Sequence, residues 1–114
     1  MHTTVRLARP DDFTAWLPLW QGYQAFYKTA IPPSVTELTW ARFHQPGDMH
    51  GAVAEADGGL VGLVHYIAHR SCWTSGDYWY LQDLFVLSQQ RGTGVGRALI
   101  QHVYASALAQ GAAP

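Results

Sequence analysis

Residues 80–100 read YLQDLFVLSQQRGTGVGRALI, and the other elements of the chain are arranged around them. The first part is an apolar run typical of a β-strand, the middle is a polar loop with three glycines, and the end has the periodicity of an amphipathic helix. Gly92, Gly94 and Gly96 carry no Cβ, so the backbone can turn tightly there and come close to a ligand. The segment therefore predicts a strand, a glycine loop and a helix in direct succession.

The start of this helix is a predicted anion site. Several main-chain N–H groups in the first turn of a helix have no partner within the helix, and the helix dipole is positive at that end. Together these features bind phosphate groups. Arg91 and Arg97 flank the glycines and add fork-shaped donors that suit phosphate oxygens. We therefore expect a phosphate-bearing ligand at the end of the strand.

The spacing of the glycines excludes two common phosphate-binding motifs. No Lys-Ser or Lys-Thr pair follows the last glycine at the distance that a P-loop requires. A dinucleotide-binding fingerprint needs a glycine three positions after its second glycine, where this chain has Arg97. The pattern that remains is Arg-x-x-Gly-x-Gly, formed by Arg91, Gly94 and Gly96.

This motif and the strand before it resemble the acetyl-CoA motif of the GNAT superfamily of N-acetyltransferases, and the order of elements along the chain is similar to that family as well. Residues 80–86 and the aromatic end of the first helix look most like the small polyamine and histone-type acetyltransferases. The resemblance implies acetyl-CoA as co-substrate, with its pantetheine arm on the main chain of Leu84, Phe85 and Val86. It also implies that the pyrophosphate is held beside Arg91 by the N–H groups of Gly92, Thr93, Gly94, Val95, Gly96 and Arg97.

Size and composition indicate one folded domain, residues 1–114, of a soluble cytoplasmic protein. Hydrophobic residues make up 48% of the chain and charged residues 13%. The formal net charge of −1 and the absence of a basic stretch argue against nucleic acid or an anionic membrane as main partner. The single cysteine, Cys72, excludes an internal disulfide, and no apolar run has the length of a signal core or a membrane span.

The six histidines do not have the spacing of a metal site. His65 and His69 are four residues apart, but they fall in a predicted strand, where they share a face without forming a ligand pair. We therefore expect no metal.

Hydrophobic periodicity and turn residues predict the other elements, in the order β-α-α-β-β-β-α. Asp11 or Asp12 is expected to cap the first helix, in which Pro18 predicts a kink or a late start. Ser34 and Glu37 have the spacing of a capping box for the second helix. The predicted strands are 3–8, 51–56, 60–69 and 78–86, with a hairpin turn at 57–59, and the predicted helices are 12–28, 34–44 and 95–110.

The last predicted helix carries an apolar stripe and ends at Gly111, three residues before the end of the sequence. A strand would normally follow, because a parallel β-α-β crossover buries its helix on the sheet. We therefore expect an α/β fold with a GNAT-like mixed sheet and flanking helices that lacks its C-terminal strands and helix. An open sheet edge of this kind favours a homodimer or a complementing C-terminal fragment. The stripe consists of Val95, Leu99, Val103 and Ala107.

Acyl transfer to an amine needs a neutral amine, a polarised thioester carbonyl and a proton for the leaving thiolate. A backbone N–H on the strand can polarise the carbonyl. The polyamine enzymes that this chain resembles have a Glu where Gln82 stands, and a Gln side chain cannot take a proton. Asp83 is the other candidate base, acting directly or through water, but strand alternation predicts that it faces the opposite side. Its alternative role is structural hydrogen bonding.

Aromatic residues of the first helix are candidates for substrate binding. Tyr23 and Tyr27 can line an amine pocket through cation–π contacts or pack in the core, whereas Trp20 is expected in the core. Tyr104, on the glycine-loop helix, is expected to pack, and the family's usual general acid is a Tyr on a later helix.

Two functions remain open. The first is an N-acetyltransferase acting on a primary amine of a small molecule or a lysine side chain. The second is a non-catalytic acyl-CoA-binding or regulatory domain, which Gln82 favours.

Overall fold

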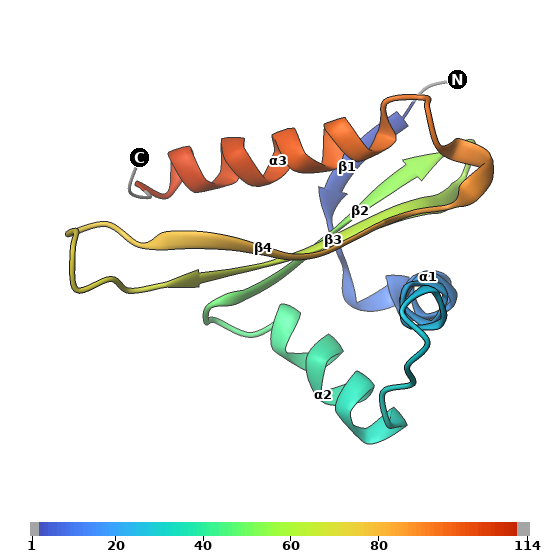
Figure 1. The fold of residues 1–114 in the computed structure, drawn as a ribbon, viewed down its shortest axis with the longest axis horizontal. Helices are drawn as coiled ribbons and strands as arrows, with labels where there is room; N and C mark the ends of the chain where they lie inside the picture. Colours follow the sequence, from blue (N-terminus) through green and yellow to red (C-terminus); the bar gives the residue numbers. More distant parts are fainter. Residues whose placement is uncertain (1–2, 112–114) are drawn as a thin grey trace.

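The fold is a single sheet with helices on both faces (Figure 1). The computed structural model describes residues 3–111 of the chain. Its four strands lie in the order β1-β2-β3-β4, with α3 on one face and α1 and α2 on the other. The predicted element order is confirmed. The elements are β1 (Thr3–Leu7), η1 (Pro10–Asp12), α1 (Phe13–Phe26), α2 (Pro33–Phe43), β2 (Met49–Ala56), β3 (Gly59–His69), β4 (Tyr78–Val86), η2 (Ser88–Gln90) and α3 (Val95–Ala109).

All strand pairs among the described residues are antiparallel. The predicted hairpin joins β2 to β3 through Asp57 and Gly58, whose φ angles of 53° and 80° are both left-handed. Two positive φ angles in succession define the turn that matches the twist of paired strands. The resemblance implies a mixed sheet, which contains parallel as well as antiparallel strand pairs. A parallel pair needs a further strand that follows a helical crossover such as α3.

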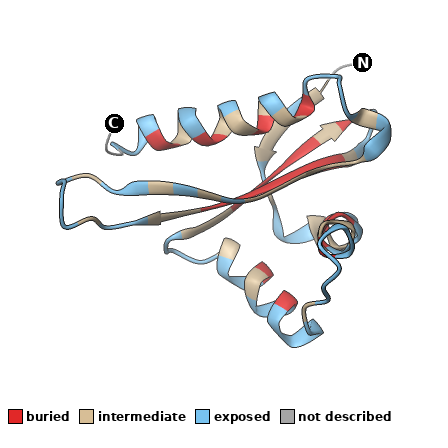
Figure 2. Ribbon diagram, viewed as in Figure 1, coloured by how far each residue is buried: buried red, intermediate tan, exposed pale blue. Residues whose placement is uncertain are grey.

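A separate apolar core lies on each face of the sheet (Figure 2). The predicted stripe of α3 is confirmed, because its four residues, among them Leu99 and Val103, are buried on the face that packs against the sheet. The other core contains Trp16, Trp20 and Trp40 packed between α1, α2 and the sheet. Figure 1 shows that the far ends of β3 and β4 extend beyond both layers.

The late start considered for the first helix and the capping box predicted for the second need correction. Helix α1 begins at Phe13, upstream of Pro18, because burial of its aromatic face outweighs the hydrogen bond that a proline cannot make. Helix α2 begins at Pro33, and Ser34 makes no capping hydrogen bond, so the predicted capping box is wrong. A proline fits the first helical position, where its missing N–H would have had no partner.

The packing role expected for Tyr104 is also wrong, because 69% of its surface is exposed. It lies on the side of α3 away from the stripe that contacts the sheet. Gly111 has a φ of 75°, as a residue directly after a helix end often does.

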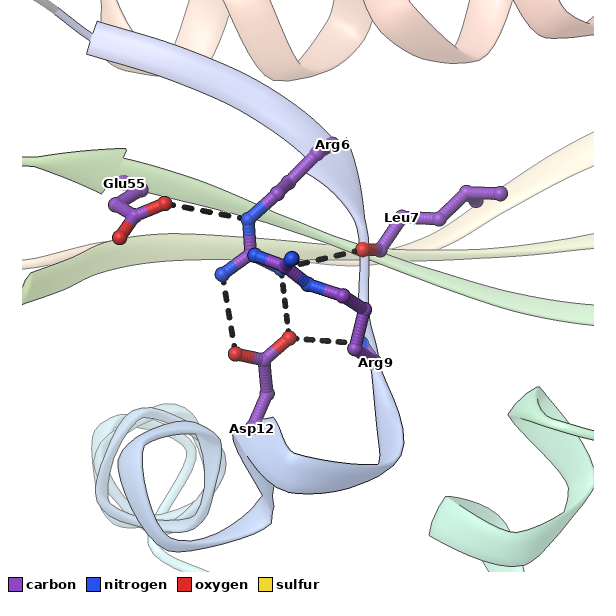
Figure 3. Close-up of polar contacts among 5 residues, drawn as sticks. All are labelled: Arg6, Leu7, Arg9, Asp12 and Glu55. Carbon is purple, nitrogen blue, oxygen red and sulfur yellow. Dashed lines mark hydrogen bonds and ion pairs between the residues drawn. The ribbon is translucent and has the colours of Figure 1, made fainter.

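Asp12 occupies the capping position of α1 but its carboxylate faces the sheet, as Figure 3 shows. It accepts hydrogen bonds from Arg6 Nη1 at 2.7 Å and Nη2 at 3.0 Å, and from the Arg9 N–H at 2.7 Å. Arg6 Nε also contacts Glu55 at 3.2 Å. The hydrogen bonds from Arg6 and then from Arg9 hold the pKa of Asp12 below its ordinary value, which burial only partly opposes. This cluster ties β1 and β2 to the start of α1.

We expect Asp12→Asn to lower the free energy of unfolding at pH 7 by about 1–3 kcal/mol, since a charge-assisted pair is lost. A carboxylate whose pKa is lower in the folded state stabilises the fold at pH values above its unfolded pKa of about 3.9. This contribution is lost as the pH falls through the folded-state pKa. The difference between variant and wild type should therefore narrow below about pH 4. Urea unfolding at pH 7 and below about pH 4 measures this difference in the free energy of unfolding. Asp11→Asn, at the exposed neighbour, is the matched control, and an equal loss there would contradict the assignment.

Candidate functional site

The glycine loop has the backbone geometry that an anion site requires. Gly92 has a φ of 83° and Gly94, the residue before α3, a φ of 89°, so both stand in the left-handed region that favours glycine. Gly96 lies in α3, as the predicted helix 95–110 requires, and it does not take part in the tight turn expected of the three glycines. A Cβ there would lie 3.8 Å from Val86 Cγ2, which is normal van der Waals contact.

Several N–H groups of this loop are free. The first intrahelical hydrogen bond runs from the Ala98 N–H to the Gly94 carbonyl at 3.0 Å. Within residues 3–111, no acceptor pairs with the N–H groups of Gly92, Gly94, Val95, Gly96 or Arg97. They precede or open a 15-residue helix, whose dipole is positive at this end. The loop can therefore hold an anion through its main chain.

Arg91 links the loop to the end of β4. Its Nε donates to the Val86 carbonyl at 3.3 Å, and its side chain is exposed. Arg97 is exposed on the first turn of α3. Both guanidinium groups thus stand where the sequence predicted positive charge near the free N–H groups.

A small cavity of about 280 Å³ runs along the end of β4, next to the loop. Residues 84–86 pair with β3 on one side only, because β4 is the last strand of the sheet. Their other edge therefore carries main-chain groups that a ligand can reach. The cavity is lined by Tyr23, Phe26, Tyr27, Leu84, Phe85, Val86 and Arg91.

A β-bulge places Gln82 and Asp83 in the same neighbourhood, which corrects the prediction that they face opposite sides. His65 pairs with Asp83 and Tyr66 with Leu81, so Gln82 is an extra residue on β4. Leu81 and Leu84 consequently both pack against the core under α3, and regular alternation is broken between them. Asp83 instead faces α1, on the side of His65.

A larger cavity of about 530 Å³ lies between α1, α2 and the bulge. It shares Tyr23 and Tyr27 with the smaller cavity, so these two side chains form a common wall. Gln82 and Asp83 both contribute to it. The complete lining is Trp20, Tyr23, Gln24, Tyr27, Thr29, Ile31, Thr39, Phe43, Met49, His65, Tyr66, Ile67, Gln82 and Asp83.

The aromatic wall is organised by stacking. Trp20, predicted in the core, is 6% exposed and stacks on Tyr23 with ring centroids 5.6 Å apart. Tyr23 contacts Tyr27 at 5.0 Å. Burial, and then the charge of Asp83, raises the pKa of the Tyr23 phenol, so it stays protonated and available as a donor. The Tyr23 hydroxyl and the Asp83 carboxylate are thus close neighbours.

Asp83 has a buried partner that the sequence did not reveal. His65 Nδ1 lies 3.0 Å from Asp83 Oδ2, and the other ring nitrogen, Nε2, accepts from Trp16 Nε1 at 3.1 Å. His65 is 3% exposed and Trp16 1%. Trp16 is 49 positions and Asp83 is 18 positions from His65 along the chain, so no local motif indicates these contacts.

His65 and His69 do not form a metal site together with other ligands. Across residues 3–111, no cluster of three or more His, Cys, Asp or Glu side chains is placed to hold an ion. His69 is exposed whereas His65 is buried. In the same part of the chain, no helix has both the length and the apolar character needed to cross a bilayer.

Comparison with known proteins identifies the family. Residues 13–113 match the sequence profile of the Acetyltransferase (GNAT) family. The chain belongs to this family. The GNAT chain is also 41% identical over 106 residues to the D-amino-acid N-acetyltransferase HPA3 of Saccharomyces cerevisiae. That match covers 90% of the chain and 66% of the yeast protein, so the chain spans slightly less than two thirds of its relative's length.

Solved structures share the fold of this GNAT chain. A ribosomal-protein-alanine N-acetyltransferase from Brucella melitensis biovar Abortus 2308 superposes with a TM-score of 0.84 at 21% identity, over 99% of this chain and 76% of that one. The AAC(6')-Iy structure, solved with the bisubstrate analogue CoA-S-monomethyl-acetylneamine, also gives 0.84, at 20% identity over 98% and 76%. At these identities the likeness concerns the fold.

Proposed function

We propose that this chain is an N-acetyltransferase that moves an acetyl group from acetyl-CoA to a primary amine of a small molecule or a lysine side chain. The observation that carries the proposal is the meeting of two cavities at Tyr23 and Tyr27. One cavity follows the open edge of β4 toward the glycine loop, and the other contains the Asp83 carboxylate. A donor and an acceptor could thus approach each other across one aromatic wall.

The residues present suit acetyl-CoA as donor. The free N–H groups of the loop, with Arg91 and Arg97, would hold the pyrophosphate, and the open edge of residues 84–86 would take the amide groups of the pantetheine arm. Bound there, acetyl-CoA would supply an activated thioester. The family and the shared fold support this assignment.

The larger cavity suits an ammonium group. Asp83 is the one charged side chain among its described lining residues, and the rings of Tyr23 and Tyr27 are positioned for cation–π contact. We propose that Asp83 accepts the proton that the ammonium must lose, directly or through a water. The free amine then attacks the thioester carbonyl carbon, the new C–N bond forms and the C–S bond breaks. The second proton that the nitrogen gives up goes to the leaving thiolate, directly or through water.

The acceptor class follows from the relatives and from the cavity. The name of HPA3 makes D-amino acids the first acceptors to test. The described lining of the larger cavity contains no Lys or Arg to pair with a carboxylate. This favours polyamines and other cationic amines as acceptors to test alongside the D-amino acids. A cytoplasmic location, and a homodimer or a complementing C-terminal fragment, stay predictions.

Release of CoA tests the proposal. The 114-residue chain, incubated with acetyl-CoA and a panel of polyamines, D- and L-amino acids and aminoglycosides, should liberate free thiol with at least one amine. A thiol reagent follows the rate, and mass spectrometry of the product should show the added acetyl group. Tight acetyl-CoA binding without turnover on any amine would contradict the enzyme and support the alternative, a non-catalytic acyl-CoA-binding or regulatory domain, which Gln82 favours.

A further inference from the structure

We infer that His65 is a positioning residue for Asp83, and that Trp16 holds the His65 ring in the tautomer this role requires. The inference rests on the proposed function, because it assigns to Asp83 the task of accepting the proton of the amine. His65 touches neither the donor nor the reacting atoms; it acts through the carboxylate.

The hydrogen bonds determine the tautomer of His65. The indole N–H of Trp16 is a donor and cannot accept, so the ring nitrogen facing it, Nε2, must present a lone pair. In a neutral ring the proton then sits on Nδ1, and it points at Asp83 Oδ2. Asp83 therefore accepts a hydrogen bond from a neutral donor.

The surroundings of His65 do not favour another tautomer of its ring. Its imidazole packs against the rings of Trp16 and Trp20 from α1, at 5.8 and 4.8 Å, and of Phe43 from α2, at 4.8 Å. Among the described neighbours these rings are uncharged, so Asp83 of β4 is the charged group that faces it, with the Tyr23 phenol beyond. His65 is 3% exposed, so losing the hydrogen bond at Nε2 would be costly.

The position of Asp83 explains why a positioning residue is useful. Asp83 follows the extra residue of a β-bulge, where the regular ladder no longer dictates the direction of side chains. The bond from His65 engages Oδ2, which leaves Oδ1 for the cavity. In metal sites, outer partners that orient a ligand typically contribute about 10- to 100-fold to affinity or activity, and we expect a similar range here.

Removing the indole N–H of Trp16 tests the tautomer. Trp16→Phe keeps an aromatic ring but leaves His65 Nε2 without a donor. The bond that required a free lone pair at Nε2 is then gone, and Nε2 no longer accepts a hydrogen bond from a side chain of α1.

Nitrogen NMR of ¹⁵N-histidine-labelled protein reads this change. In the wild type at pH 7, His65 should show a protonated Nδ1 and an unprotonated Nε2, and in Trp16→Phe the Nε2 signal should shift because that nitrogen no longer accepts a hydrogen bond. Trp20→Phe is the matched control, because Trp20 also packs on His65 but its Nε1 has no hydrogen-bond partner among the described residues. His65 should keep its proton on Nδ1 and its hydrogen bond at Nε2 in this variant. A wild-type ring protonated at Nε2, or a Trp16→Phe spectrum in which the Nε2 signal matches the wild type, would overturn the inference.

Kinetics of two His65 variants test the role itself. His65→Asn retains an N–H donor toward Asp83 and should keep more activity than His65→Leu, which we expect to lower kcat by about 10- to 100-fold with a smaller change in KM. Equal kcat values in two folded variants would overturn the role. If the wild type itself releases no CoA, the proposed function fails, and the NMR result still decides the tautomer and the contact.

Discussion

Asp83→Asn is expected to lower kcat for acetyl transfer at pH 7 by about 10²- to 10⁴-fold, the range that a positioned acid–base group contributes. The substitution keeps the size of the side chain and an oxygen that can accept the bond from His65 Nδ1, now at 3.0 Å from Asp83 Oδ2. It removes the ability to accept a proton. The loss should shrink at alkaline pH, where more of the amine enters already neutral. Initial rates of CoA release over a pH series measure both effects.

The split between kcat and KM separates a base from a carboxylate that only binds the ammonium. A base lost from the site lowers kcat, whereas loss of a carboxylate that only binds the ammonium raises KM at unchanged kcat. Asp77→Asn serves as control, since this exposed acid lies in the loop before β4 and outside both cavities. An unchanged kcat in Asp83→Asn would refute the assignment as base.

The parts of the fold that depend on local chemistry could be predicted from the sequence. The turn at Asp57 and Gly58, the strand over residues 78–86 and the stripe of α3 each follow from a few neighbouring residues and are observed. The glycine loop was predicted for the same reason, since a left-handed φ at Gly92 and Gly94 is a property of the backbone itself.

The interior of the larger cavity could not be predicted, because distant contacts build it. A bulge shifts the register of a strand by one residue, and the sequence around Asp83 does not distinguish a bulged strand from a regular one. The bond between Trp16 and His65 joins α1 to β3 across 49 residues, so periodicity identifies both as buried without pairing them. At the start of α2, Ser34 and Glu37 fit a capping pattern, but the conformational preference of Pro33 determines where the helix begins.

Gly94→Val is expected to weaken acetyl-CoA binding by at least about tenfold. A β-branched residue is strongly disfavoured at the φ of 89° found here, at a cost of about 1–3 kcal/mol. The added side chain would meet nothing within 4 Å, so the backbone conformation, and not crowding, is the reason. The loop can relieve the strain only by rotating its peptide groups, which turns the free N–H groups away from the phosphate. Calorimetric titration with acetyl-CoA measures the change.

Gly96→Ala distinguishes a requirement for left-handed backbone from a general need for glycine in the loop. Gly96 is helical, and its Cβ would point at Val86 Cγ2 in the sheet, away from the free N–H groups. We therefore expect this variant to bind acetyl-CoA like the wild type, while circular dichroism confirms that α3 is intact in both variants. If Gly94→Val, correctly folded, retained wild-type affinity, the loop could not be the pyrophosphate site. If Gly96→Ala lost affinity as well, the ligand would have to approach the backbone from the side of β4. That result would contradict the proposed direction of binding.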